Sequence, residues 1–130
     1  MHIEHLITQG QLKDGVISFT YNGTTQMLGE RASGKMITDS DACNFVYLFE
    51  DGETYQYVHF TEDVWPLMQQ LIEQNNGDPL LKCENGTVQL TGFTEELTML
   101  IFNIEGNGNY GEAFMLAVEE TFQKTLQQSI

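Results

Sequence analysis

Hydrophobic residues recur with a helical period between Phe93 and Phe122, and this segment shows the clearest pattern in the chain. Apolar side chains spaced three and four residues apart fall on one face of a helix. The positions with this spacing in the first half of the segment are Leu97, Leu100, Ile101 and Ile104. Thr94 precedes two glutamates, so we expect it to be the N-cap of this helix. Gly106 predicts the end of the helix.

Two other segments carry the same period. A helix beginning near Gly111 would align Phe114, Ala117, Val118, Thr121 and Phe122 in one apolar stripe. A helix over Thr61 to Asn75 would bury Val64, Trp65, Met68, Leu71 and Ile72. Pro66 fits the first turn of a helix capped by Asp63, whereas a cap at Thr61 would cost the helix one backbone hydrogen bond. We therefore expect three helices.

Strand signals fall into three predicted hairpins, each with a two-residue turn that contains glycine. Asn22-Gly23 would join Val16 to Tyr21 with Thr24 to Leu28. Asp51-Gly52 would join Cys43 to Glu50 with Glu53 to Phe60, and Asn85-Gly86 would join Leu80 to Cys83 with Thr87 to Thr91. His2 to Thr8 and Lys35 to Thr38 are predicted as additional short strands.

The turn at Asp51-Gly52 predicts which side chains of its hairpin share a face. In that register Leu48 pairs with Tyr55, and Val46 pairs with Tyr57. Both faces of the hairpin then carry large apolar groups. The hairpin is therefore either covered on both faces by the rest of the domain, or covered on one face with a tyrosine surface left for a partner.

A hairpin followed by a helix occurs twice along the chain. Phe60-Thr61-Glu62-Asp63-Val64 and Phe93-Thr94-Glu95-Glu96-Leu97 share one pattern, and each follows a predicted hairpin. The sequence thus predicts a ββα unit used twice within a single α+β domain over residues 1–130. We expect an antiparallel sheet of about six or seven strands built from hairpins, with three helices packed mainly on one face.

The charge of the chain limits the partners that it can bind. Nineteen acidic residues stand against five basic ones, for a formal net charge of -14. Because such a chain repels phosphate backbones and anionic headgroups, we expect neither a nucleic acid nor a membrane as its partner. The sequence shows no cationic apolar leader and no apolar run of about 18 residues, which favours a cytoplasmic protein. A basic protein or a bound cation fits the charge better.

The sequence contains no pair of residues that would act as nucleophile and base. Cys43 and His59 are the nearest candidates, but the predicted hairpin sends their side chains to opposite faces, beyond hydrogen-bond reach. Cys43 and Cys83 are also too few for a disulfide scaffold, and a free thiol within a strand behaves as a small hydrophobic group. We therefore expect no catalytic residue and no cofactor.

Asp39 and Asp41 form the best carboxylate pair in the sequence. In an extended turn they would converge on one divalent cation, with Ser40 or backbone carbonyls completing an oxygen shell. The alternative is that both aspartates only form side-chain-to-backbone bonds within the turn.

Three tyrosines are the candidates for recognition, because tyrosine offers a rigid surface with a polar tip. Tyr55 and Tyr57 lie in the central hairpin, and Tyr110 lies beside Asn107 and Asn109 in the loop from Gly106 to Gly111. The alternative for each tyrosine is core packing with a bonded hydroxyl. The loop matches the G-x-G-x-x-G spacing, but it follows a predicted helix where dinucleotide binding requires a strand, so we do not expect it to bind nucleotides.

Several strings of residues, taken together, resemble a known family. They are Gly34-Lys35-Met36-Ile37-Thr38-Asp39-Ser40-Asp41, Phe45 to Phe60, Trp65, Glu95-Glu96-Leu97 and Asn103-Ile104-Glu105-Gly106-Asn107-Gly108-Asn109-Tyr110-Gly111. In these strings the chain resembles the YjbL-like family of small acidic proteins from Bacillales, over about Gly34 to Phe122. The resemblance implies a soluble cytoplasmic protein of an uncharacterised family, so no catalytic residue is carried over. Pro66 departs from the family pattern and leaves only the start of its helix in question.

Two functions follow from these observations. The first is a non-catalytic protein-interaction module that binds an unknown protein, or a second copy of itself as a homodimer, through the tyrosine face or the loop from Gly106 to Gly111. The second is a cation-dependent enzyme or small-ligand binder, in which the fold brings Asp39 and Asp41 next to the loop from Gly106 to Gly111.

Overall fold

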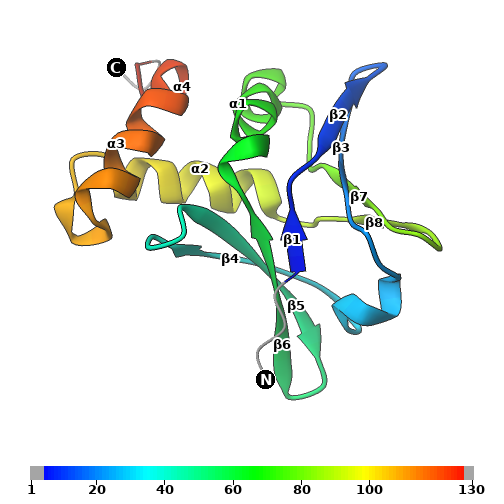
Figure 1. Cartoon of the computed structure of the whole chain (residues 1–130). Coiled ribbons are helices and arrows are strands. Elements are labelled where there is room, and N and C mark those ends of the chain that lie inside the picture. The colour runs from blue at the N-terminus through cyan, green and yellow to red at the C-terminus, as the bar shows by residue number, and fades with distance from the viewer. Residues whose placement is uncertain (1–4, 128–130) are drawn as a thin grey trace.

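Two four-stranded sheets and four α-helices make up the computed structural model, which describes residues 5–127 (Figure 1). The first sheet has the order β1 (His5–Ile7), β6 (Thr54–Phe60), β5 (Asn44–Asp51) and β4 (Arg31–Asp39). The second has the order β2 (Gly10–Lys13), β3 (Val16–Thr20), β7 (Leu80–Lys82) and β8 (Thr87–Gln89). The helices are α1 (Trp65–Gln74), α2 (Phe93–Ile104), α3 (Glu112–Thr121) and α4 (Gln123–Gln127). Three 3-10 turns are η1 (Thr25–Leu28), η2 (Glu62–Val64) and η3 (Gly108–Tyr110).

The predicted α+β class is confirmed, but the prediction of one antiparallel sheet is wrong. β1 pairs in parallel with β6, and β3 pairs in parallel with β7, so both sheets are mixed. Tight turns join antiparallel neighbours only, and parallel partners lie far apart in the chain, so turn signals could not reveal them. The ββα unit does occur twice: β5 and β6 precede α1, and β7 and β8 precede α2.

The hairpin predicted at Asn22-Gly23 does not form. Thr25 to Leu28 is the 3-10 turn η1, and β7 occupies the side of β3 where a returning strand was expected. The backbone N–H of Tyr21 donates to the carbonyl of Lys82 at 2.9 Å, and that of Glu84 donates to the carbonyl of Gly23 at 2.8 Å. These bonds extend the pairing with β7 past the end of β3 and leave no place for a local reversal.

The central hairpin forms as predicted, but its register differs by two residues. Asp51 pairs with Thr54, so the turn contains Gly52 and Glu53. Glycine at the first position of a two-residue turn is typical of type II′, whereas the predicted register assumed a type I′ turn with glycine second. Because side chains alternate with a period of two, the shift leaves every side chain on its predicted face.

The other strands extend or shorten the predicted ones. Of the predicted strand His2 to Thr8, residues 5–7 form β1 and residues 2–4 lie outside the described residues. The predicted strand Lys35 to Thr38 is the middle of the longer β4, which contains a bulge between Ala32 and Lys35. Cys43 and Cys83, expected inside strands, lie in the turn before β5 and directly after β7.

The helices agree with the predicted periods in all but their ends. Pro66 lies in the first turn of α1, where its missing N–H costs nothing. The last predicted helix is divided at Phe122 into α3 and α4, so the described chain has four α-helices where three were expected. The prediction that Thr94 caps α2 is wrong: Gly92 occupies the N-cap position, and the Thr94 side chain donates to the carbonyl of Gly77.

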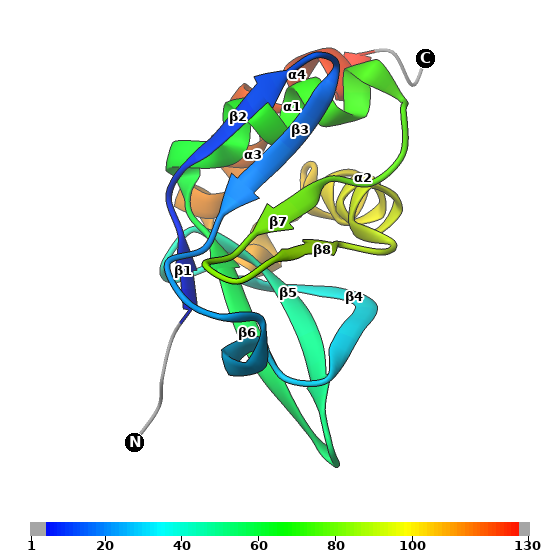
Figure 2. The same ribbon diagram turned by 90° about the vertical axis from the view of Figure 1, so that its right-hand side faces the viewer.

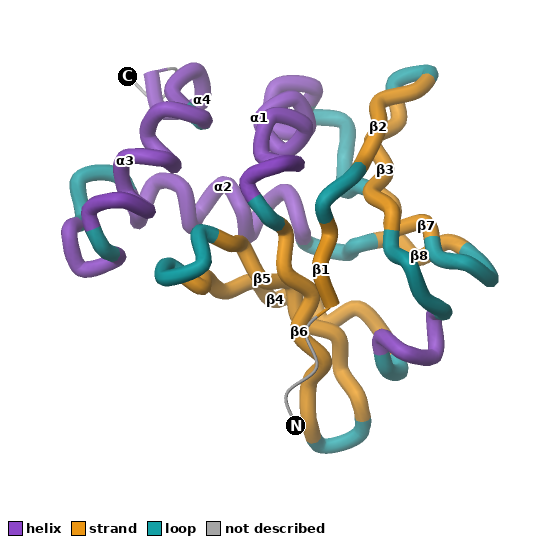
Figure 3. The backbone as a smooth tube through the Cα atoms, in the orientation of Figure 1, coloured by secondary structure: helices purple, strands orange, loops and turns teal. Residues whose placement is uncertain are grey.

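Phe93, at the start of α2, joins the two sheets in the core. Its ring centroid lies 5.0 Å from that of Phe60 in the first sheet and 5.8 Å from that of Phe19 in the second. Phe45 on β5 contacts the helical layer through Trp65, at a centroid distance of 5.2 Å. Figure 2 shows the second sheet beside α1 and α2, and Figure 3 shows the helices gathered on one side of the first sheet. The core therefore lies between one face of the first sheet, the second sheet and the helices.

Candidate functional site

The first sheet packs on the core with one face only. The four helices lie above it in Figure 1, and no other element of the described chain covers its opposite side. On β5, Phe45, Tyr47 and Phe49 point to the core, so the alternating positions Val46 and Leu48 point the other way. We call this second side the outer face. Of the two arrangements left open by the sequence, the structure shows the hairpin covered once.

Cross-strand pairing places apolar and aromatic side chains in rows across the outer face. One row runs Ile37, Val46, His59 and Leu6 over all four strands. The next runs Lys35, Leu48 and Tyr57, and a third pairs Glu50 with Tyr55. Solvated sheet faces usually carry polar side chains at such positions. The outer face is therefore more apolar than solvent exposure alone would favour.

Residues at the centre of the outer face are nearly inaccessible to solvent. Val46 and Leu48 are 2% and 7% exposed, although no helix covers them. Ile37 and Leu6, at the two ends of their row, are 45% and 50% exposed. Exposed aliphatic residues beside buried ones on a sheet face are typical of a surface that contacts a partner.

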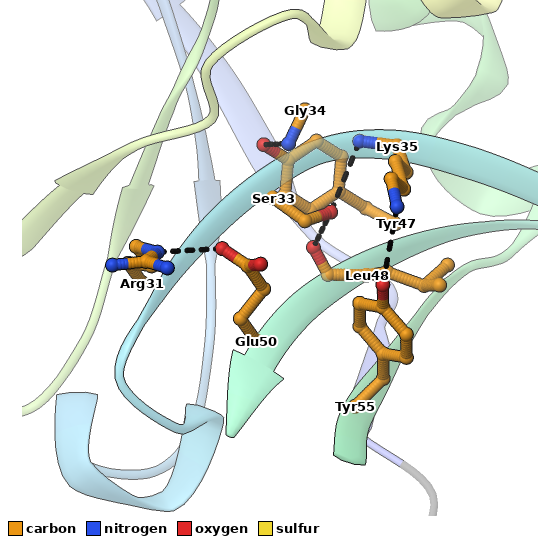
Figure 4. A network of polar contacts seen from close by, with 8 residues as sticks. All are labelled: Arg31, Ser33, Gly34, Lys35, Tyr47, Leu48, Glu50 and Tyr55. Carbon is orange, nitrogen blue, oxygen red and sulfur yellow. Dashed lines mark hydrogen bonds and ion pairs between the residues drawn. The ribbon is translucent and has the colours of Figure 1, made fainter. Parts of the chain in front are cut away.

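Two cations lie at the hairpin end of the outer face (Figure 4). Arg31 Nε donates to Glu50 Oε2 at 2.5 Å, and this bond lowers the pKa of Glu50 below its ordinary value. Lys35 Nζ donates to the hydroxyl of Tyr55 at 3.1 Å and lies 5.5 Å from the centroid of the same ring. Both cations therefore have partners within the face, and the Tyr55 hydroxyl already accepts a hydrogen bond.

A hollow of about 240 Å³ opens at the other end of the outer face. Its lining residues are Ile37, Thr38, Asp39, Val46, Tyr57 and His59. Asn44 Nδ2 lies 3.3 Å from His59 Nδ1. Asp39 Oδ2 lies 3.9 Å from the same Nδ1. The hollow thus combines apolar side chains, one imidazole and one carboxylate.

The structure brings some of the predicted site residues together and leaves others apart. Tyr57 and Asp39, predicted for two different functions, line the same hollow, and Tyr55 lies on the same face. Asp41 is exposed in the turn after β4 and is not among the lining residues. Among residues 5–127, no group of three or more histidine, cysteine, aspartate or glutamate side chains is placed to hold a metal ion.

The loop from Gly106 to Gly111 forms hydrogen bonds within itself and to helix α3. Asn107 Oδ1 accepts the backbone N–H of Asn109 at 3.0 Å, and the backbone N–H of Gly106 donates to Glu119 Oε2 at 2.7 Å. The Tyr110 ring packs against Phe114 at a centroid distance of 6.3 Å. None of these residues lines the hollow beside Asp39. The loop follows α2, so it has the helical context that the sequence predicted.

The two thiols have the character of packed groups. Burial raises the pKa of Cys43, and the neighbouring Glu62 raises it further. Burial alone raises the pKa of Cys83. A raised pKa lowers the fraction of reactive thiolate at neutral pH.

Sequence reasoning missed the residues that complete the hollow. Because the pairing of β4 with the central hairpin was not predicted, Ile37 and Val46 were not candidates, and His59 was considered only as a base for Cys43. Lys35, Ile37 and Asp39 alternate along the chain, and pairing that segment with β5 would have placed all three on the tyrosine side. The alternation therefore indicated that Lys35, Ile37 and Asp39 share a face. It did not indicate that their strand pairs with β5.

Comparison with known proteins identifies a family. The model named UPF0738, a family of unknown function, matches residues 5–122. A UPF0738 protein of Lysinibacillus sphaericus is 32% identical over 95% of this chain and 97% of its own length. A UPF0738 protein of Staphylococcus epidermidis is 38% identical over 90% of this chain and 95% of its own length. No solved structure gives a significant match.

These relatives bear on the resemblance seen in the sequence. An uncharacterised family with members in Bacillales is confirmed, whereas the YjbL-like name stays a prediction. Of the helices in residues 5–127, none has the length and apolar character that a bilayer span requires. With a family model matched over most of its length and relatives aligned nearly end to end, the chain belongs to the UPF0738 family.

Proposed function

We propose that this protein is a non-catalytic protein-interaction module that binds a basic partner protein through the outer face of its first sheet. The observation that carries the proposal is the row of Leu6, His59, Val46 and Ile37 across four strands, which no element of the described chain covers. Three of its four residues are aliphatic, and the two at its ends are about half-exposed. The family resemblance further implies that the module acts in the cytoplasm, and the length of 130 residues favours a single domain.

The tyrosines of the outer face support this proposal. Tyr55 and Tyr57 stand next to buried Val46 and Leu48, and both rings are partly exposed. Protein interfaces are enriched in tyrosine, because the ring buries a large area and loses little conformational freedom. The loop from Gly106 to Gly111 supports a second contact less well, since its asparagine and backbone groups bond within the loop or to Glu119.

Net charge favours a basic partner over a second copy. Two copies that each carry a formal charge of -14 repel one another at low ionic strength, whereas a basic protein is attracted. The same charge disfavours nucleic acids. A homodimer, the other form of this function, is therefore an outcome that the experiment must be able to detect.

Site-specific photocrosslinking tests the proposal in the full chain. The photoreactive residue p-benzoyl-phenylalanine replaces Ile37 on the outer face or, as a control, Met99 on α2, which is 49% exposed. We expect a discrete product from position 37 alone, containing a basic protein. With that protein purified, Ile37→Asp should lower its affinity at least about tenfold, because a charge would be buried in an apolar contact, and Met99→Asp should change it less than about twofold.

Three results would overturn the proposal. They are equal products from positions 37 and 99, no product from position 37 while light scattering shows only monomer, and a product that contains a second copy of this chain. The last result would establish self-association in place of a basic partner.

A second candidate function is a cation-dependent small-ligand site at Asp39. It is favoured by the carboxylate at the hollow, with the His59 ring 3.9 Å away. A melting scan with Mg²⁺, Mn²⁺ and Ca²⁺ tests it, because a ligand at 100 times its dissociation constant stabilises a fold by about 2.7 kcal/mol. Stabilisation that disappears in Asp39→Asn would support this candidate, and no shift with any of the three ions would remove it.

A further inference from the structure

The hollow beside Asp39 has the size of one side chain. Its volume of about 240 Å³ lies below the roughly 300–1,000 Å³ of sites for drug-sized ligands. Ile37, Tyr57 and Val46 are among its lining residues, and Val46 is only 2% exposed. Such a cavity can take the aliphatic stem of a long side chain, which buries its methylene groups while its polar head stays near water.

The hollow also has a defined charge. Asp39 is the only carboxylate among its six lining residues, and the His59 imidazole, with Nδ1 3.9 Å from Asp39 Oδ2, is the only basic group among them. The Asp39 side chain is 37% exposed, so a guest can reach it from solvent. The cations Arg31 and Lys35 are held at Glu50 and Tyr55, near the other end of the face. Neither Arg31 nor Lys35 is therefore paired with the carboxylate in the hollow.

An arginine side chain matches both properties. Its guanidinium pairs with a carboxylate through two parallel hydrogen bonds, and its planar group stacks on an aromatic ring. Asp39 and Tyr57 supply these two partners in one hollow. Lysine would satisfy the charge but would gain less from the ring and from the carboxylate geometry.

We propose that the hollow lined by Ile37, Asp39, Val46, Tyr57 and His59 is the anchor site for an arginine side chain of the partner protein. This inference rests on the proposed interaction function and names the chemistry that the outer face recognises. The arginine stem lies on Ile37 and Val46, and the guanidinium meets Asp39 beside the Tyr57 ring. The rest of the outer face then contacts the surface around that arginine.

A titration followed by ¹⁵N–¹H NMR tests the anchor with the full chain and defined probes. The probe is N-acetyl-arginine N-methylamide, and N-acetyl-norleucine N-methylamide is the matched control, because it keeps an aliphatic stem and lacks the charge. We expect the arginine probe to shift the amide signals of Ile37, Val46, Tyr57 and His59 saturably. The norleucine probe should bind at least about fivefold more weakly.

Two variants separate the hollow from the general acidity of the chain. Asp39→Asn keeps the shape of the side chain and should reduce arginine binding to the norleucine level. Glu53→Gln removes the same charge from the exposed turn of the central hairpin, outside the hollow, and should change arginine binding less than about twofold. Well-dispersed spectra of both variants establish that each is folded.

The anchor is overturned if Asp39→Asn binds the arginine probe as the parent does, if norleucine binds equally well, or if the largest shifts lie outside the hollow. Failure of the anchor and failure of the interaction function can be told apart. If a basic partner is captured through position 37 and its affinity is unchanged by Asp39→Asn, only the anchor proposal is contradicted. If Asp39→Asn abolishes arginine binding but no partner is captured, the interaction function is contradicted. The hollow then stands as a guanidinium-binding site.

Discussion

Asp78 caps helix α2 from outside the helix, with its Oδ1 3.0 Å from the backbone nitrogen of Thr94. Its second carboxylate oxygen accepts the backbone N–H of Gly92 at 2.9 Å. The first N–H groups of a helix have no partner within it, and a carboxylate also interacts favourably with the helix dipole. Asp78 therefore has the capping role that was predicted for the hydroxyl of Thr94.

Asp78→Ala should lower the free energy of unfolding by about 1 to 2 kcal/mol, because two backbone donors at the start of α2 lose their acceptor. Asp78→Asn should lose less, since an amide oxygen still accepts one of the two bonds. Urea denaturation measures both changes, and Glu53→Ala, on an exposed turn, is the control with an expected change within about 0.5 kcal/mol. A loss no larger than that of the control would show that the cap contributes nothing.

Tyr47→Phe should destabilise the protein by about 1 to 3 kcal/mol, because the fully buried ring carries a hydroxyl with two backbone partners. That hydroxyl accepts the N–H of Gly34 at 3.1 Å (Figure 4). It also donates to the carbonyl of Thr91 at 2.5 Å. It thus ties the bulge of β4 to the segment that leads into α2. Thermal or urea unfolding checks the loss, and a neutral substitution would mean that water replaces the hydroxyl at both partners.

The same tyrosine predicts a pH dependence. Burial raises the pKa of Tyr47 to about 12, from an ordinary value of 10.0. Since the folded protein holds this proton more tightly than the unfolded chain, its contribution to stability is complete below pH 10 and is lost as the pH rises towards 12. Urea midpoints across this range should fall less steeply for Tyr47→Phe. A residual fall is expected, because burial also raises the pKa of Tyr21. Parallel curves for the two proteins would contradict the assignment to Tyr47.

Gly92→Ala should be more damaging than Gly106→Ala, although both glycines have a positive φ, of 76° and 68°. A Cβ at position 92 would lie 3.2 Å from the Cα and 3.3 Å from the carbonyl oxygen of Gly34, whereas a Cβ at 106 meets open space. Gly106→Ala should therefore cost about 1 kcal/mol, from backbone strain alone. Gly92→Ala should cost about 1 to 2 kcal/mol more, because the backbone of β4 must shift. Equal unfolding midpoints for the two variants would argue that α2 and the β4 bulge are not in firm contact.

The elements that the sequence predicted well are those whose signal is local. Helical periods located α1, α2 and α3, and alternation together with tight turns located the hairpins β5–β6 and β7–β8. The hairpin of β2 and β3 was missed although Asp14-Gly15, its two-residue turn, carries the same signal as the turns that were used. Asn22-Gly23 carries that signal too, but there the tertiary pairing of β3 with β7 prevails over it.

The candidate site could be predicted only in part, because it depends on pairing between distant strands. Tyr55, Tyr57 and Asp39 were identified from residue type and local pattern. Their common face depends on β4 lying beside β5 along its whole length, and the end of the apolar row depends on Leu6 in β1, which reaches β6 across more than fifty residues of sequence. Side-chain alternation assigns residues to a face, but it does not say which distant strand completes that face.

Gln69 and Thr125 form a buried pair between α1 and α4 that is only partly satisfied. The Thr125 hydroxyl donates to Gln69 Oε1 at 3.0 Å, while Gln69 Nε2 is buried with no hydrogen-bond partner among the described residues. Thr125→Val alone should cost about 1 to 3 kcal/mol, because it leaves the amide oxygen unpaired as well.

The double variant Gln69→Met with Thr125→Val should be at least as stable as the parent, because removing both partners together leaves no buried polar group unpaired and keeps similar side-chain volumes. Urea denaturation of the two single variants and the double variant gives the coupling energy directly. A double variant less stable than Thr125→Val alone would show that Gln69 Nε2 makes a stabilising hydrogen bond. The polar pair would then stabilise the contact between α1 and α4.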